Sequence, residues 1–60
     1  MVIKMKDWLV YKHNDKIDAV EYEWTFEQYY SLQLAGCEII GCPAAREKED
    51  AIEYIKQITA

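Results

Sequence analysis

Cys42, followed by Pro43, is the first candidate for chemistry in this chain. Proline suits the first position of a helix, because its missing N–H would have no partner there in any case. We therefore expect Cys42 at a helix N-terminus, where the helix dipole lowers the pKa of a thiol and favours the thiolate. Cys37 stands five residues earlier, where it could resolve an oxidised Cys42. A thiol-redox protein is thus one hypothesis, beside a structural role for two buried cysteines.

His13 is the single histidine, and it falls in a predicted turn. General acid–base catalysis needs a partner group and a pocket, and a hairpin tip offers neither. The two cysteines lack zinc-ligand spacing, and there is no glycine-rich phosphate loop. A chain of 60 residues also has little room for a water-excluding pocket. We therefore expect no enzymatic activity, no metal site and no cofactor.

The charge is acidic and unevenly spread, with a formal net value of −4. Four lysines against two aspartates leave residues 1–16 at +2, and three basic against nine acidic side chains leave residues 17–60 at −6. We expect no direct nucleic-acid binding, since phosphate contacts need a basic surface. The acidic residues fit a solvated helix face. As an alternative, they form one surface that inhibits a nucleic-acid-binding protein by imitating phosphates: Glu21, Glu23, Glu27, Glu47, Glu49, Asp50 and Glu53.

The N-terminal third of the chain is predicted to form two strands. Residues 2–12 mix lysines with apolar residues on both sides of the alternation, which is typical of a central strand. Asn14 and Asp15 tolerate positive φ and predict a two-residue hairpin loop, and residues 17–24 predict the second strand. This loop fixes the register. One face then carries the pairs Leu9–Val20, Met5–Trp24 and Asp7–Tyr22, and the other carries Trp8–Glu21, Val10–Ala19, Lys12–Ile17 and Lys6–Glu23.

A helix over residues 26–35 follows, with signals at both ends. Thr25 and Gln28 have capping-box spacing, and Gly36 suits the left-handed residue that closes a helix. Three apolar residues recur every four positions, which predicts a stripe facing the sheet. Beyond it, residues 37–42 predict a third strand, and residues 44–59 predict a second helix with Pro43 at its start. The predicted stripe consists of Phe26, Tyr30 and Leu34.

These elements predict one α+β domain over residues 1–60 with the order β-β-α-β-α. The third strand is expected beside the first and antiparallel to it, which gives a three-stranded antiparallel sheet of order 2-1-3. We expect two layers, with both helices on the face that carries Leu9 and Val20. The opposite, outer face is then left without a helix.

That outer face is the predicted interaction surface. Its apolar residues are rimmed by charged ones, which is the composition of a protein interface rather than of scattered exposed side chains. The alternative is that the second helix folds over this face and makes three layers. The residues predicted to bind a partner are Lys6, Trp8, Val10, Ile17, Ala19 and Glu21.

The sequence therefore predicts a small, non-enzymatic protein-interaction module, a regulator or inhibitor, that binds a larger protein or self-associates as a homodimer. We expect no membrane association, because the longest uncharged runs are far too short to span a bilayer. With two cysteines and no signal peptide at the start of the sequence, we expect a cytoplasmic location.

Overall fold

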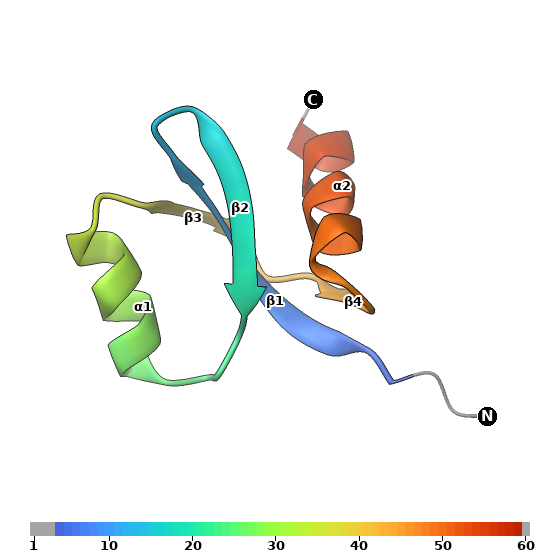
Figure 1. Cartoon of the computed structure of the whole chain (residues 1–60), viewed down its shortest axis with the longest axis horizontal. Coiled ribbons are helices and arrows are strands. Elements are labelled where there is room, and N and C mark those ends of the chain that lie inside the picture. Colours follow the sequence, from blue (N-terminus) through green and yellow to red (C-terminus); the bar gives the residue numbers. More distant parts are fainter. Residues whose placement is uncertain (1–3, 60) are drawn as a thin grey trace.

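The computed structural model describes residues 4–59, and it forms an antiparallel sheet with two helices (Figure 1). This confirms the predicted α+β fold and the strand order β2-β1-β3, to which a short fourth strand is added. The predicted start of the first strand, residues 2 and 3, lies outside the described residues. The elements are β1 (Lys6–His13), β2 (Lys16–Glu21), α1 (Phe26–Leu34), β3 (Glu38–Gly41), β4 (Ala44–Ala45) and α2 (Lys48–Thr59).

The β1–β2 hairpin has the predicted loop, and it has the predicted register from Trp8–Glu21 to His13–Lys16. The predicted pairs Met5–Trp24, Lys6–Glu23 and Asp7–Tyr22 are not among its strand pairs. Asn14 and Asp15 have φ values of 50° and 64°, so both central residues of the turn are left-handed, as a type I′ turn requires. The register places Val10 opposite Ala19 and His13 opposite Lys16. Strand β2 ends at Glu21 rather than at residue 24, although the N–H of the next residue still donates to the carbonyl of Asp7 at 2.8 Å.

Strands β3 and β4 both pair antiparallel with β1, β3 with its C-terminal half and β4 with its N-terminal end. Between them, the carbonyl of Pro43 accepts a hydrogen bond from the N–H of Trp8 at 2.9 Å. Residues 38–45 thus form one interrupted strand along one edge of β1. A register shift between Val10 and Tyr11 marks an irregularity in this ladder.

The second helix begins later than predicted. Ala44 and Ala45 are good helix formers, but they pair with Asp7 and Lys6 in the sheet, and α2 starts at Lys48. Pro43 is therefore not the first residue of a helix. The helix propensity of the two alanines stabilises the chain less than their pairing in the sheet does, where Ala45 is also buried.

The two helices lie on opposite sides of the strands, so the arrangement has three layers (Figure 1). The prediction that both helices cover the Leu9 face is wrong. Helix α2 packs its Ala51 and Ile55 against Val10 and Ala19, on the face that was expected to be open. An ion pair of 3.4 Å between Lys48 and Asp18 ties the start of α2 to β2.

The core is small and lies mainly between the sheet and α2. Val10, Ala51 and Ile55 are its most buried members, and Ala19 and Ala45 complete it. Alternation places Leu9, which is also buried, on the other face of β1. Within the part of the chain that the structure describes, three of the six buried hydrophobic residues are alanines, so few large side chains are buried there.

Candidate functional site

Helix α1 is held in one orientation by hydrogen bonds at both ends. The Thr25 hydroxyl accepts from the N–H of Gln28 at 3.2 Å, which confirms the predicted cap. The Gln28 side chain accepts from the N–H of Glu23 at 2.9 Å and donates to the carbonyl of Glu21 at 2.8 Å. These bonds turn the Gln28 side of the helix toward the end of β2. They therefore decide which face of α1 looks outward.

The C-terminus of α1 is closed by the predicted glycine. Gly36 has a φ of 84°, a left-handed value that few residues other than glycine adopt. Its N–H donates to the carbonyl of Gln33, and the N–H of Cys37 donates to that of Leu32, both at 3.0 Å. This pair of bonds is a Schellman motif, which fixes where the chain leaves the helix for β3.

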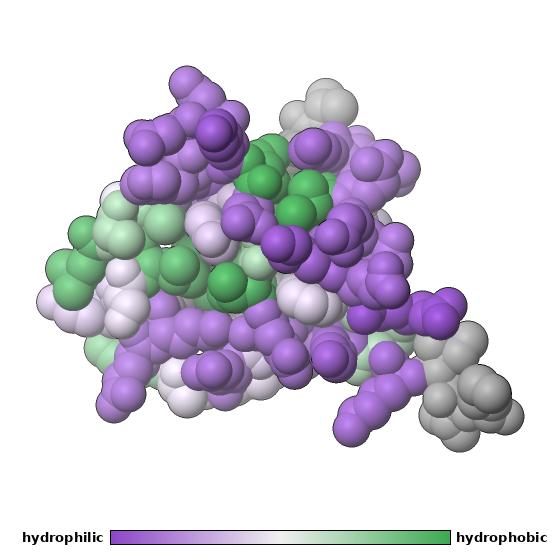
Figure 2. All heavy atoms as spheres, viewed as in Figure 1, coloured by the Kyte–Doolittle hydropathy of each residue, from purple (hydrophilic) through white to green (hydrophobic). Residues whose placement is uncertain are grey.

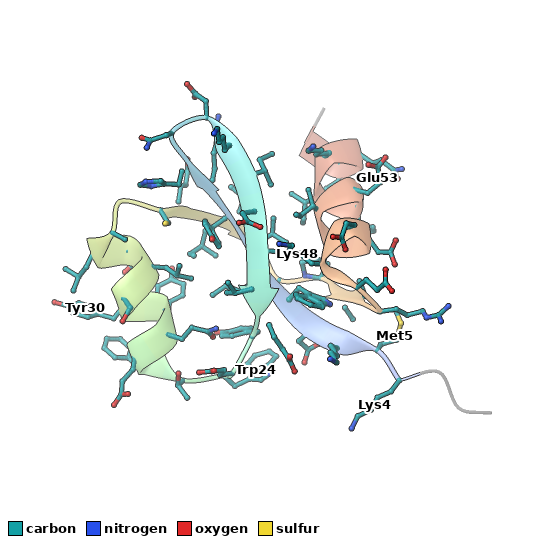
Figure 3. All side chains as sticks on the ribbon, in the orientation of Figure 1. Lys4, Met5, Trp24, Tyr30, Lys48 and Glu53 are labelled. Carbon is teal, nitrogen blue, oxygen red and sulfur yellow. The ribbon has the colours of Figure 1, made fainter. Side chains whose placement is uncertain are left out.

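The apolar stripe of α1 faces solvent and not the sheet. Phe26 is 77% exposed, Tyr30 49% and Leu34 70%, so their predicted inward position is wrong. The half-buried side of the helix carries Tyr29 and Leu32 instead. Figure 3 shows Tyr30 pointing away from the strands, and Figure 2 shows hydrophobic residues gathered over this end of the molecule.

Trp24, just before the start of the helix, is a second exposed aromatic feature, beside the hairpin. It is 67% exposed and has a φ of 59°, a costly backbone conformation for a bulky residue. Its ring stacks on Tyr22 with centroids 4.3 Å apart, and its indole N–H donates to an Asp7 carboxylate oxygen at 3.1 Å. The fold thus holds a large aromatic ring in a fixed position on the surface (Figure 3).

We call the four residues Trp24, Phe26, Tyr30 and Leu34 the aromatic ridge. Phe26 and Tyr30 stack with centroids 5.6 Å apart and ring planes 19° from parallel. A large aromatic side chain has about 150–250 Å² to bury, so these exposed fractions leave roughly 350 Å² of surface on the Phe26–Tyr30–Leu34 row and roughly 150 Å² on Trp24. The largest apolar patch of a monomeric protein is about 300–600 Å² and is often functional.

The residues predicted to bind a partner lie elsewhere and are mostly covered. Val10 is 0% exposed and Ala19 4%, both beneath α2. Trp8 and Ile17 are half-buried against the same cluster, and the Trp8 indole N–H donates to the carbonyl of Ala45 at 3.0 Å. The expectation of an open sheet face is therefore wrong, and a partner could reach this face only by displacing α2.

The charged rim of that face is exposed. Lys6 and Glu21 form an ion pair of 3.8 Å, with more than 45% of each side chain exposed. Exposed pairs of this kind contribute about 0–1 kcal/mol. Lys6 and Glu21 thus lie at the exposed rim of the face that α2 covers.

Neither cysteine is placed as the thiol hypothesis requires. Cys42 precedes a strand and not a helix, so the expected helix dipole is missing at its thiol. Both cysteines are free thiols, Cys42 exposed and Cys37 half-buried, at the two ends of β3. Five steps of extended chain span about 16 Å, whereas a disulfide needs Cα atoms within about 7 Å. Cys37 cannot resolve Cys42 while β3 is formed.

The other titratable candidates are dispersed. His13 is exposed at the hairpin tip, with Gly36 as a neighbour. The acidic residues are divided between the two helices, since Glu27 lies in α1 whereas Glu49, Asp50 and Glu53 lie in α2, on the opposite side of the strands (Figure 1). Burial raises the pKa of Tyr11 above its ordinary value of 10, and the nearby Asp18 and Cys37 raise it further, while Lys48 opposes them.

Comparisons with known proteins supply no further guide, since no family model, curated protein or solved structure matches this chain. Within residues 4–59, no group of three or more histidine, cysteine or acidic side chains is placed to hold a metal ion. No helix in the same part of the chain has the length and apolar character to cross a membrane. The aromatic ridge is therefore the feature from which a function can be argued.

Proposed function

We propose that this protein is a small protein-interaction module without catalytic activity, a regulator or inhibitor, and that its binding surface is the aromatic ridge. The observation that carries the proposal is the exposure of three large apolar side chains along one side of α1 and of the Trp24 ring just before it. Two hydrogen bonds of the Gln28 side chain and the left-handed backbone of Trp24 hold this surface outward. Residues with a strained backbone are found more often at binding sites than elsewhere on a protein.

The ridge also has the composition of an interface centre. Tryptophan and tyrosine are enriched among the residues that dominate binding energy, and two stacked pairs hold these rings in place before a partner arrives. Side chains already fixed lose less freedom on association, which favours affinity. Because both cysteines are free thiols, we place this activity in the cytoplasm.

A comparison of captured proteins tests the proposal. Tagged wild type, Phe26→Asp and Tyr54→Asp are each expressed in the cells that naturally make the chain, and co-purifying proteins, untagged copies included, are identified by mass spectrometry. Tyr54 is an exposed aromatic residue on α2, so its substitution is the matched control. We expect at least one protein that is retained by wild type and by Tyr54→Asp but lost with Phe26→Asp. The same captured set for all three chains would contradict the proposal.

A further inference from the structure

We infer that the aromatic ridge binds a second copy of this chain, with the two α1 helices packed antiparallel around a two-fold axis at Tyr30. The inference rests on the proposed function, because it names the occupant of the same surface. It depends on the spacing of the ridge residues, the distribution of charge on α1, and the thin core.

The spacing makes the ridge self-complementary. Phe26 and Leu34 lie four residues on either side of Tyr30, so they form one row along the helix. Rows of this spacing interdigitate in the commonest class of helix packing, with the axes crossing at about −50°. A two-fold axis at Tyr30 places Phe26 against the partner's Leu34, and the reverse. A large ring thus meets a smaller branched side chain at both ends of the contact, as an isologous interface requires.

The charges of α1 fit the antiparallel arrangement. Glu27, in the first turn, is the single charged residue of the helix, and residues 28–37 carry no formal charge. Antiparallel packing places each Glu27 beside the uncharged last turns of the partner helix. Parallel packing would place the two Glu27 carboxylates together, and like charges at an interface are costly.

The thin core favours a copy as the occupant. The Phe26–Tyr30–Leu34 row offers roughly 350 Å² on each chain, so a dimer of standard size, which buries about 800 Å² per partner, must also cover residues beside the row. A domain of this length is marginally stable alone, and the part of this one that the structure describes has six buried hydrophobic residues. Association of folded copies adds stability by mass action, and a copy is always present with the chain.

Sedimentation equilibrium of the full chain tests the inference, from about 1 μM to about 1 mM, the range that covers micromolar dissociation constants. We expect wild type to approach twice its monomer mass of 7.1 kDa. Tyr30→Asp should weaken the dimer by about 30-fold or more, as expected for a central aromatic residue. Tyr54→Asp, the exposed aromatic of α2, should leave it unchanged.

A charge-pairing experiment tests the position of the two-fold axis and distinguishes loss of the dimer from loss of the fold. Tyr30→Asp and Tyr30→Lys should each be monomeric, because position 30 would face its own charge across the axis. Their equimolar mixture should recover a mixed dimer, which unfolded variants could not do. A mixture that stays monomeric, or a dimer that Tyr54→Asp and not Tyr30→Asp disrupts, would overturn the arrangement.

A wild type that stays monomeric throughout the range would overturn the second copy as occupant. The proposed function would still stand if the capture experiment found a different protein that Phe26→Asp loses. Both fail together only if the chain is monomeric and the captured proteins do not depend on the ridge.

Discussion

The contact between Gly41 and Ile55 offers a sharp test of where α2 packs. A Cβ atom added at Gly41 would lie 2.6 Å from Ile55 Cδ1 and 3.6 Å from its Cγ1. Ile55 is 2% exposed, so its terminal methyl has little space to move. Gly41→Ala should therefore overpack the core, at about 1–3 kcal/mol, offset by about 0.5–1 kcal/mol from the lost chain freedom of glycine. We expect a net loss of about 1–2 kcal/mol in the free energy of unfolding.

Removing the clashing methyl should reverse this loss. Ile55→Val deletes Cδ1 and costs about 0.5–1.5 kcal/mol on its own. In the Ile55→Val chain the nearest remaining atom is at an ordinary contact distance, so adding Gly41→Ala should then be neutral or stabilising by about 0.5 kcal/mol. The double variant should thus be more stable than the sum of the single changes by about 1–2 kcal/mol.

Urea unfolding of the four chains, followed by circular dichroism at one fixed protein concentration, measures this coupling. Ile52→Val is the control partner, since Ile52 packs against the same cluster but has no atom near Gly41. It should add to Gly41→Ala within about 0.5 kcal/mol. If the effects of Ile55→Val and Gly41→Ala on the free energy of unfolding were also additive within about 0.5 kcal/mol, α2 would not lie over Gly41. That result would refute the three-layer arrangement.

Two further predictions concern the hairpin. Asp15→Gly should raise the free energy of unfolding by about 0.5–1 kcal/mol, because glycine adopts the left-handed φ of 64° without steric cost; thermal unfolding measures it, and an unchanged or lower melting temperature would contradict the reasoning. Tyr11 should make stability fall as the pH rises above about 10, since its folded pKa is raised and the unfolded chain loses that proton first. Urea titrations should show a smaller fall for Tyr11→Phe, and equal falls would argue against the raised pKa.

Local signals in the sequence predicted the hairpin and both ends of α1. The turn residues Asn14 and Asp15 fixed the loop length, and the loop length fixed every pair of the β1–β2 register. Thr25 and Gly36 marked the ends of α1, and each has the backbone conformation that its role requires. In each of these cases the deciding interactions lie within a few residues along the chain.

The rotation of α1 could not be predicted in the same way. The helix carries apolar residues on two sides, Phe26 and Tyr30 on one and Tyr29 and Leu32 on the other, so periodicity alone does not select the buried side. Gln28 selects it through its bonds to the connection after β2. The sequence therefore identifies the stripe of Phe26, Tyr30 and Leu34, but the direction of the stripe depends on Gln28, whose spacing from Thr25 predicts a capping role alone.

The position of α2 depended on contacts distant in sequence. Strand β1 is apolar on both faces, through Leu9 on one and Trp8 and Val10 on the other, and either could have accepted the helix. The pairing of Lys6 with Ala45 settles it, because it draws the chain before α2 into the sheet and under the Trp8 indole. Such pairing across almost forty residues leaves no mark in local propensity.

The orientation of Pro43 has a consequence for the behaviour of the sheet toward other chains. An exposed edge strand offers a row of unpaired backbone groups on which foreign strands can grow, and proline is one of the residues that blunt such edges. Here the proline stands between β3 and β4, in the middle of the edge that residues 38–45 form. The N–H and C=O of one residue in a strand point to the same side, and the Pro43 carbonyl accepts from Trp8, so the missing N–H of Pro43 faces β1 and not the open edge. The proline therefore interrupts the pairing of residues 38–45 with β1, and it does not block their outer edge against another strand.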